Sequence, residues 1–301
     1  MTNPSAGEAS SAHESRGAGA PLGRRPGGAR ARAALFGWGG NALIALVGLV
    51  WLLPYAWMVS TSLKTLPELV RAPAAPLPAS FSTEAYAAAL AAMPFTRYLW
   101  NTTLMALLIA ALQIVVALPA AYALAKLDFR GRSVAFALLV STLVVPAQVR
   151  FVPVFSLLAD FGLANTMAAL VLPFGVSAFG TFLLRQALLS VPDSLIEAAR
   201  LDGAGELTII YRLLPPLVRP TLAAFFLFSF TYHWNDYFWP LVMTTDDSVR
   251  TLPLGVALLR EQGTGVRWHV VMAGNLLLSA PALAVFAVAQ RHLTRAVAAR
   301  A

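Results

Sequence analysis

Six stretches of the chain are long and apolar enough to cross a membrane as helices. They run over Leu35–Met58, Thr103–Leu127, Val134–Phe155, Thr166–Leu184, Thr221–Met243 and Val270–Gln290. A bilayer core is about 30 Å thick, which a helix of roughly 20 apolar residues spans. In lipid every backbone N–H and C=O group needs a hydrogen-bond partner within the protein, and a continuous apolar segment satisfies these groups by forming a helix. The pattern predicts an all-α, polytopic membrane protein with six transmembrane helices.

Composition supports this prediction and excludes several other classes. Hydrophobic residues make up 58% of the chain and charged residues 12%, whereas soluble domains are about 25% charged. The chain has no cysteine, which excludes disulfides and thiolate metal sites, and its four histidines are scattered. The chain has a net charge of +8. Its basic residues lie between the apolar spans and form no basic groove, so we expect no nucleic-acid partner.

The distribution of basic residues predicts the topology. The chain divides into a tail over residues 1–33, a six-helix domain over 34–293 and a short tail over 294–301. The first tail is rich in Gly, Ala, Ser and Arg, which predicts disorder. Fifteen Lys and Arg lie on the side that holds both termini and seven on the other. Because basic residues stay inside, both termini are predicted to be cytoplasmic.

The third span is the least regular of the six. Its second half contains Pro146, Gln148, Arg150 and Pro153. Proline breaks or kinks a helix because it lacks an N–H and clashes with the preceding turn. We therefore expect this tail to bend into an interfacial helix near Asp160.

One compact charged segment, residues 190–218, lies in the predicted cytoplasmic loop after the fourth span. Ser194 and Glu197 have the spacing of a capping box, with Asp193 at the positive helix end. Gly203 is placed to end the helix in the left-handed conformation. The spacing predicts a helix of two to three turns.

A second helical pattern follows within the same segment. Leu207, Ile210, Tyr211 and Leu214 fall at i, i+3, i+4 and i+7, which predicts one apolar stripe, and Pro215, Pro216 and Pro220 then break the helix. On these residues alone, an ordinary cytoplasmic helix-turn-helix loop and a docking element for a partner are both open.

The segment resembles the EAA loop of permease subunits in ATP-binding-cassette importers. "EAARLDGA" and "LLPP" place Glu197, Gly203, Leu213 and Pro216 in the family's register, while Pro215 stands where leucine is usual. "WNDYFWPLVM", "TLPLGVALL" and "AVFAVAQRHL" are similar to the maltose-type second permease subunit of the carbohydrate branch, over roughly residues 40 to 293. "TRAVAARA" lacks the glycine- and lysine-containing tail common in that family.

The resemblance implies an importer-type permease fold in a bacterial plasma (inner) membrane. It implies a coupling helix that docks on an ATPase subunit, carried here by Glu197, Ala198, Ala199, Asp202, Gly203 and Pro216. It also implies four kinds of partner: a second homologous permease subunit, two cytoplasmic ATPase subunits, an extracytoplasmic solute-binding protein and membrane lipid. The implied cargo is a sugar or oligosaccharide, with a polyol or a glycerophosphoryl compound as the alternative.

The chain shows no sequence motif for catalysis of its own. A phosphate-binding loop needs Lys directly after Gly, whereas Lys64 follows Leu63 and Lys126 follows Ala125. We therefore expect no enzyme activity and no cofactor in this chain, with ATP and magnesium bound by the partner ATPase.

Polar residues inside the spans are candidates for the translocation path. "HWNDYFWP" carries Trp234, Asn235 and Asp236 near the outer boundary of the fifth span, where Tyr237 and Trp239 would also suit an aromatic belt. The motif is either an interfacial anchor or a gate of the path. Gln113 and Asn275 lie at mid-membrane depth and need partners there, either across helices or on a solute.

Two rival classes remain open from the sequence. A gradient-driven secondary transporter would need coupling carboxylates at the midplane, and Asp236 is the only acidic residue within a predicted span. A membrane-embedded enzyme would need a catalytic cluster, which the residues do not suggest.

Overall fold

The computed structural model describes residues 27–260 and 267–298, and those residues form helices and connecting turns with no strand. The chain divides into two units, Met1–Pro54 and Tyr55–Ala301. The boundary falls inside the first helix. The all-helical prediction is confirmed.

The described part of the first unit is helix α1, Gly27–Ser62, which continues past Pro54 into the second unit. Its segment Gly40–Ser62 has a mean hydropathy of 2.1 and is long enough to span. Residues 27–33, predicted as disordered tail, belong to this helix. Alanine and arginine are among the best helix formers, and a helix that has already nucleated extends at low cost. Residues 1–26 of the predicted tail lie outside the described residues.

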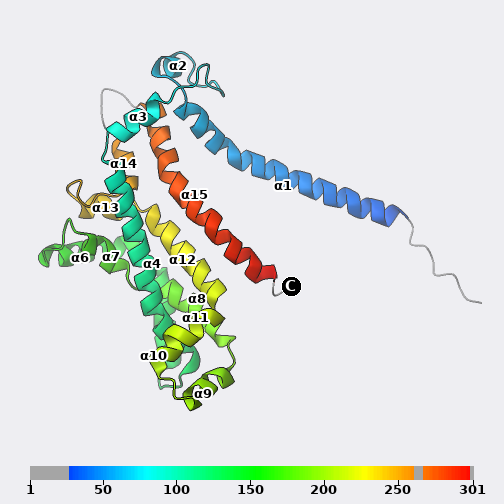
Figure 1. The fold of residues 1–301 in the computed structure, drawn as a ribbon, viewed down its shortest axis with the longest axis vertical. Helices are drawn as coiled ribbons and strands as arrows, with labels where there is room; N and C mark the ends of the chain where they lie inside the picture. Colours follow the sequence, from blue (N-terminus) through cyan, green and yellow to red (C-terminus); the bar gives the residue numbers. More distant parts are fainter. Residues whose placement is uncertain (1–26, 261–266, 299–301) are drawn as a thin grey trace, which may run out of the picture. The chain divides into compact units, whose positions relative to one another are not determined.

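The second unit is built around helix α4, Phe95–Lys126. It packs against α8, Ala178–Leu189, and α12, Arg219–Trp234 (Figure 1). The face of α4 that meets them is lined by small residues, including Ala106, Ala110 and Ala117, all fully buried. Small side chains let helix backbones approach closely where lipid supplies no hydrophobic driving force.

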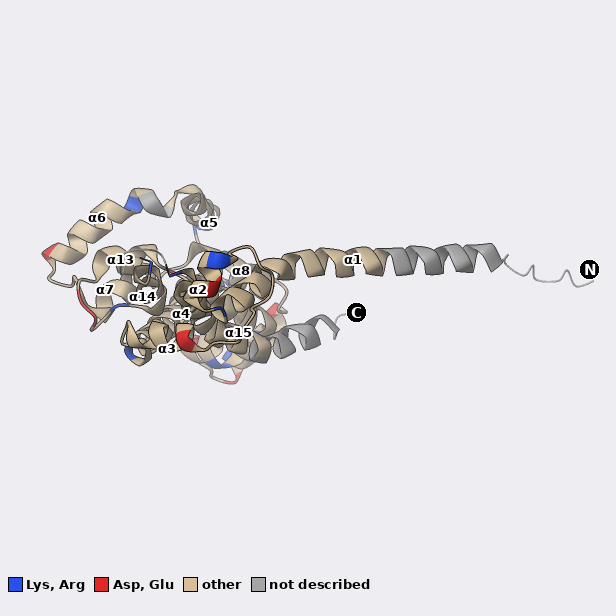
Figure 2. Ribbon diagram, turned by 90° about the horizontal axis from the view of Figure 1, so that it is seen from above, with Lys and Arg blue, Asp and Glu red and all other residues tan. Residues whose placement is uncertain are grey.

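The remaining helices connect or cover this centre. They are α2 (Leu66–Arg71), α3 (Glu84–Ala91), α5 (Arg132–Ser141), η1 (Thr142–Val144), α6 (Ala147–Asp160), α7 (Met167–Val171), η2 (Leu172–Phe174), α9 (Asp193–Leu201), α10 (Glu206–Thr208), η3 (Ile209–Leu213), α11 (Leu214–Leu217), α13 (Phe238–Met243), α14 (Leu252–Leu258) and α15 (Trp268–Ala298). Charged residues gather at helix ends and loops, and long stretches of ribbon carry none (Figure 2).

Three unbroken helices among the described residues are long and apolar enough to span, and three bent pairs bring the number to six. The six-span prediction is confirmed. The third span bends by 97° between α5–η1 and α6, as predicted from Pro146, and the fourth bends by 46° between α7–η2 and α8. These bends turn α6 and α7 toward α4 and α13, where the cavity described below lies.

The fifth span differs from the prediction of one helix over Thr221–Met243. Helix α12 ends at Trp234, and α13 begins at Phe238 after a break. At the break the Asn235 amide donates to the Thr231 carbonyl, and the Asp236 carboxylate accepts from the Trp239 N–H. Short polar side chains of this kind compete for backbone groups and end helices.

The sixth span, α15, packs on α3, α12 and α14. The shared core includes Ala85, Tyr98, Leu252 and Val271. Helix α15 runs on to Ala298, so residues 294–298 of the predicted C-terminal tail continue the helix.

Candidate functional site

Helix α9 begins two residues earlier than the capping box predicts. Pro192 is its N-cap and no side-chain cap bond forms, so the predicted role of Ser194 as N-cap is wrong. The reason lies on α4: the Lys126 ammonium donates to the Val191 carbonyl at 2.5 Å and pairs with Asp193 at 2.6 Å. This tether draws the chain into helical geometry ahead of Ser194.

The far end of α9 follows the prediction. Gly203 has φ +81°, its N–H donates to the Arg200 carbonyl at 3.0 Å, and the Ala204 N–H donates to the Ala199 carbonyl at 2.9 Å. These two bonds make a Schellman motif, which satisfies carbonyls that a helix end leaves open. A Cβ on Gly203 would meet nothing within 4 Å. The backbone conformation, and not space, therefore requires glycine here.

The predicted coupling residues lie on an accessible surface. Glu197, Ala198, Asp202, Gly203 and Pro216 are exposed and Ala199 is half-buried. On the opposite face of α9, Ile196 is buried in a core with residues of α4 and α8. The helix is anchored through its inner face and leaves its charged face open. Large apolar side chains beside it, Leu201 at 89% and Leu207 at 72% exposure, suit a surface that a partner covers.

Three side chains join the coupling segment to α4, and we call them the clasp: Tyr122, Arg200 and Glu206. The Tyr122 hydroxyl donates to Glu206 Oε2 at 2.6 Å. Arg200 Nε donates to Glu206 Oε1 at 2.9 Å, and its Nη2 donates to the Tyr122 hydroxyl at 2.9 Å. The hydrogen bond from Tyr122, then that from Arg200, lower the pKa of Glu206 below its ordinary value.

The second predicted stripe is only half correct. Ile210 and Leu214 are buried together with Ile209, whereas Leu207 and Tyr211 are exposed. The segment Ile209–Leu213 is a π-helix, whose wider turn shifts the register away from the 3.6-residue period. The chain then bends by 90° between α11 and α12, at the prolines that predicted the break.

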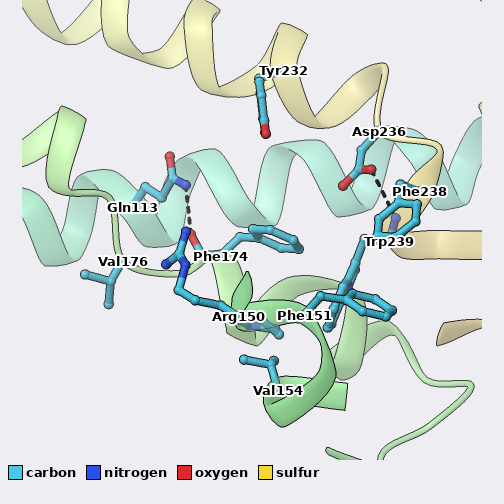
Figure 3. Close-up of a pocket in the computed structure, with 11 residues that line it drawn as sticks. Gln113, Arg150, Phe151, Val154, Phe174, Val176, Tyr232, Asp236, Phe238 and Trp239 are labelled. Carbon is cyan, nitrogen blue, oxygen red and sulfur yellow. Dashed lines mark hydrogen bonds between the residues drawn. The ribbon is translucent and has the colours of Figure 1, made fainter. Parts of the chain in front are cut away.

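A second candidate site is a cavity of about 470 Å³ within the second unit (Figure 3). Its walls come from α4, α6, η2, the end of α12 and the start of α13. It is lined by Gln113, Arg150, Phe151, Val154, Pro173, Phe174, Val176, Tyr232, Asp236, Phe238 and Trp239. Its volume falls in the range of small-molecule sites, roughly 300–1,000 Å³.

The bends of the third and fourth spans bring aromatic walls to this cavity. The Trp239 ring stands edge-on to Phe151 and Phe174, with centroids 5.5 and 5.6 Å apart. The Trp239 Nε1 donates to the Ala169 carbonyl at 2.9 Å, which fixes the indole. Phe151 and Phe174 could not be found from the sequence, because aromatic residues in apolar runs carry no positional signal.

Two of the five predicted path residues, Gln113 and Asp236, line this cavity. The Gln113 amide donates to the Phe174 carbonyl at 2.8 Å, which is the interhelical bond expected as one of its roles. The Asp236 carboxylate is half-buried and accepts from the Trp239 N–H at 3.2 Å.

The other three predicted path residues lie elsewhere. Asn235 is exposed in a neighbouring open hollow. Trp234 is 1% exposed and donates to the Leu278 carbonyl of α15, so it does not form the aromatic belt, and neither does the buried Trp239. Asn275 donates to the Val271 carbonyl of its own helix instead of bonding across helices.

Arg150 lines the cavity, although the sequence identified it only as one of the residues that make the third span irregular. It is exposed, and its side chain extends from α6 toward the side of the cavity where Gln113 and Phe174 lie (Figure 3). A basic residue in the proline-interrupted half of a span is the signal that could have identified it as a cavity residue.

Titratable groups elsewhere make no metal site: residues 27–260 and 267–298 hold no cluster of three or more His, Asp or Glu side chains. The coupling segment and the cavity are two separate candidate sites, and both contact helix α4.

Comparisons with known proteins agree with this architecture. The family of binding-protein-dependent transport system inner membrane components matches residues 113–299, more than half of the chain. The sn-glycerol-3-phosphate transport system permease protein UgpE of Yersinia enterocolitica is 36% identical over 67% of this chain and 72% of that protein. The protein of the same name from Rhizobium meliloti is 33% identical over 80% and 88%.

A chain of known structure shares the fold. It belongs to a bacterial ABC transporter involved in the import of the acidic polysaccharide alginate, with a TM-score of 0.75, 25% identity and coverage of 90% of this chain and 99% of that chain. The chain belongs to the family of binding-protein-dependent transport system inner membrane components. It is an importer-type permease, and the family predicted from the EAA loop is confirmed.

Proposed function

We propose that this permease forms half of the translocation pathway for a sugar or a related polyhydroxylated solute, and that α9 couples it to a cytoplasmic ATPase. The observation that carries the coupling proposal is the exposed, Schellman-ended helix α9, held to α4 by buried Ile196 and by the clasp. A helix anchored on one face and open on the other can transmit displacement to the span beneath it.

The coupling surface is formed by Glu197, Ala198, Ala199, Asp202, Gly203 and Pro216. Small residues allow close approach of a partner, and the carboxylates of Glu197 and Asp202 supply charge for orientation. Exposed Leu201 would fill an apolar pocket on the ATPase. ATP and magnesium are then bound by that partner, and hydrolysis there drives alternating access of the cavity.

The relatives support the remaining parts of the assembly. A similar fold occurs in an ABC transporter solved in complex with a periplasmic protein bound to an alginate pentasaccharide. We propose that this chain pairs with a second permease subunit, that two ATPase subunits bind the paired coupling helices, and that an extracytoplasmic binding protein delivers the solute. Both termini then lie in the cytoplasm, in keeping with the distribution of basic residues.

The cavity is the proposed solute site in this half of the pathway. Aromatic faces suit the C–H faces of a sugar or polyol, and the Gln113 amide, the Tyr232 hydroxyl and the Asp236 carboxylate suit its hydroxyl groups. The names of the permease relatives favour a glycerophosphoryl compound within this class.

A pair of matched variants tests the coupling proposal. Gly203→Val places a β-branched residue at φ +81°, whereas Gly205→Val adds the same side chain at φ −71°, and a Cβ meets nothing within 4 Å at either position. Each variant is co-expressed with its ATPase subunit, and the amount of ATPase that co-purifies is measured. We expect Gly203→Val to lose most of the ATPase and Gly205→Val to retain it. Equal retention by a correctly inserted Gly203→Val would remove α9 from the interface.

A further inference from the structure

The cavity carries an unequal pair of charges. Among its eleven lining residues, Arg150 is the only permanently cationic side chain and Asp236 the only carboxylate. Their surroundings differ, and this difference bears on which solutes the cavity accepts. The inference rests on the proposed function, because it concerns the same solute site.

The Asp236 carboxylate is already engaged by its own chain. It accepts a hydrogen bond from the Trp239 N–H at 3.2 Å, at the start of α13. Backbone N–H groups at a helix start stabilise a negative charge. Figure 3 shows this carboxylate turned to the α13 side of the cavity. The charge of Asp236 is therefore partly compensated within its own chain.

Arg150 has no such compensation. The ion pairs found among the placed side chains of the described residues are Lys126–Asp193, Arg132–Asp128, Arg200–Glu206 and Arg250–Asp247, and Arg150 is in none of them. The other charged residue of α6, Asp160, is ten positions away, about 15 Å along a helix at 1.5 Å per residue. The guanidinium thus leaves its charge available at the cavity.

The walls beside Arg150 are apolar, which increases the effect of its charge. Phe151, Phe174 and Trp239 cover one side of the cavity, and a low-dielectric wall weakens the screening of a nearby charge. A guanidinium presents paired N–H donors that match the geometry of a carboxylate or a phosphate. The same aromatic faces would hold the carbon skeleton of a polyol or a sugar.

We propose that the cavity selects polyhydroxylated solutes that carry a carboxylate or a phosphate, with Arg150 binding the anionic group. Gln113 and Tyr232 face the hydroxyl groups, and Asp236 disfavours a second anionic group near α13. The names of the relatives agree with this chemistry, since sn-glycerol 3-phosphate and an acidic polysaccharide are both anionic.

The test measures solute binding to the assembled permease–ATPase complex in lipid nanodiscs by calorimetry. The probes are two matched pairs: sn-glycerol 3-phosphate with glycerol, and glucuronate with glucose. We expect the anionic member of at least one pair to bind tenfold or more tightly than its neutral partner. Tighter binding of sn-glycerol 3-phosphate than of glycerol shows that the site binds a phosphate. Tighter binding of glucuronate than of glucose shows that it binds a carboxylate.

Variants then assign the preference to Arg150. Arg150→Gln is expected to abolish it, and Arg150→Lys to retain part of it, because an ammonium keeps the charge but loses the paired donors. Arg71→Gln, which removes an exposed arginine of α2 that does not line the cavity, serves as the matched control and should bind as wild type does.

Three outcomes overturn the inference: equal binding of charged and neutral probes, an anion preference that survives Arg150→Gln, or no binding of any of the four probes. ATPase co-purification is measured on the same samples. A complex that assembles with its ATPase but shows no anion preference rejects this inference and leaves the coupling proposal standing, whereas loss of assembly in Gly203→Val alone concerns only the coupling proposal.

Discussion

The Tyr122 hydroxyl and the Glu206 carboxylate are hydrogen-bonded at 2.6 Å across 84 residues of sequence. The bond connects the central helix α4 to the start of α10, and Arg200 of α9 bridges both partners. Because α4 also lines the cavity through Gln113, one helix runs from the coupling segment to the solute site. The clasp is thus placed to convert movement of α9 into movement of α4.

Removal of the Tyr122 hydroxyl tests this route. Tyr122→Phe deletes two hydrogen bonds of the clasp while keeping the buried ring. We expect the free energy of unfolding to fall by about 1–3 kcal/mol, because the hydrogen-bond partners include charged groups. We expect normal ATPase co-purification but several-fold less solute transported per ATP hydrolysed in proteoliposomes. Tyr237→Phe, which removes a partly exposed hydroxyl outside the clasp, should leave this ratio unchanged.

Reversal of the clasp's ion pair provides a rescue experiment. Arg200→Glu and Glu206→Arg should each lower the transport-to-hydrolysis ratio, and the double variant should recover part of it, because the pair can form again with its charges exchanged. Absence of any recovery, with assembly intact, would show that the two side chains act separately. The pair is half-exposed, so its contribution to global stability is expected to be small.

Gly180 tests the packing of α8 on α12. A Cβ at this position would lie 2.1 Å from Phe225 Cζ, on a ring that is itself buried. Overpacking of this kind lowers the free energy of unfolding by about 1–3 kcal/mol. Gly180→Ala should therefore lower the thermal unfolding midpoint in detergent. Gly205→Ala, whose Cβ meets nothing within 4 Å, is the matched control. Equal midpoints for the two variants would mean that the helices separate without cost.

The contacts of Asp247, which lies between α13 and α14, predict that the stability of the folded protein depends on pH. Its carboxylate accepts from the Tyr98 hydroxyl at 2.6 Å and pairs with Arg250 at 2.8 Å. The hydrogen bond from Tyr98, followed by Arg250, lowers the pKa of Asp247 below its ordinary value of 3.8. The pKa of Asp247 is lower in the folded state than in the unfolded state. The ionised carboxylate therefore stabilises the fold fully above about pH 4, and this stabilisation is lost as the pH falls through the lowered pKa.

Thermal unfolding of Asp247→Asn against wild type, from pH 7 to pH 3, checks this dependence. We expect the variant to be less stable at pH 7 and the difference to shrink in the acid range. Asp160→Asn is the control, because no hydrogen bond or ion pair of Asp160 is found among the placed side chains of the described residues. A stability difference between wild type and Asp247→Asn that stays constant down to pH 3 would contradict the lowered pKa of Asp247.

Features that depend on local sequence were predicted well. The six spans follow from the length of each apolar run, since each helix satisfies its own backbone in lipid. Gly203 was predicted as the left-handed end of α9 because the Schellman motif involves only residues within one turn. The bend after η1 followed from Pro146 for the same reason.

Three features were missed or wrong, one because of a contact between distant residues and two because polar side chains bond to the backbone nearby. The capping role of Ser194 failed because Lys126, from another helix, holds Asp193 and Val191. The continuous fifth span failed because Asn235 and Asp236 bond to nearby backbone groups instead of extending the helix. Asn275 bonds within its own helix, although its depth alone suggested a partner across helices.

The sequence by itself determined the class of protein, the number of spans and the position of the coupling segment, because apolar length, charge distribution and motif spacing are properties of consecutive residues. Only the tertiary structure decided which side chains share the cavity. Arg150 lines this cavity together with Gln113, Phe174 and Asp236 because bends of 97° and 46° turn two broken spans toward α4. Bend angles arise from the packing of several helices at once, which no single stretch of sequence encodes.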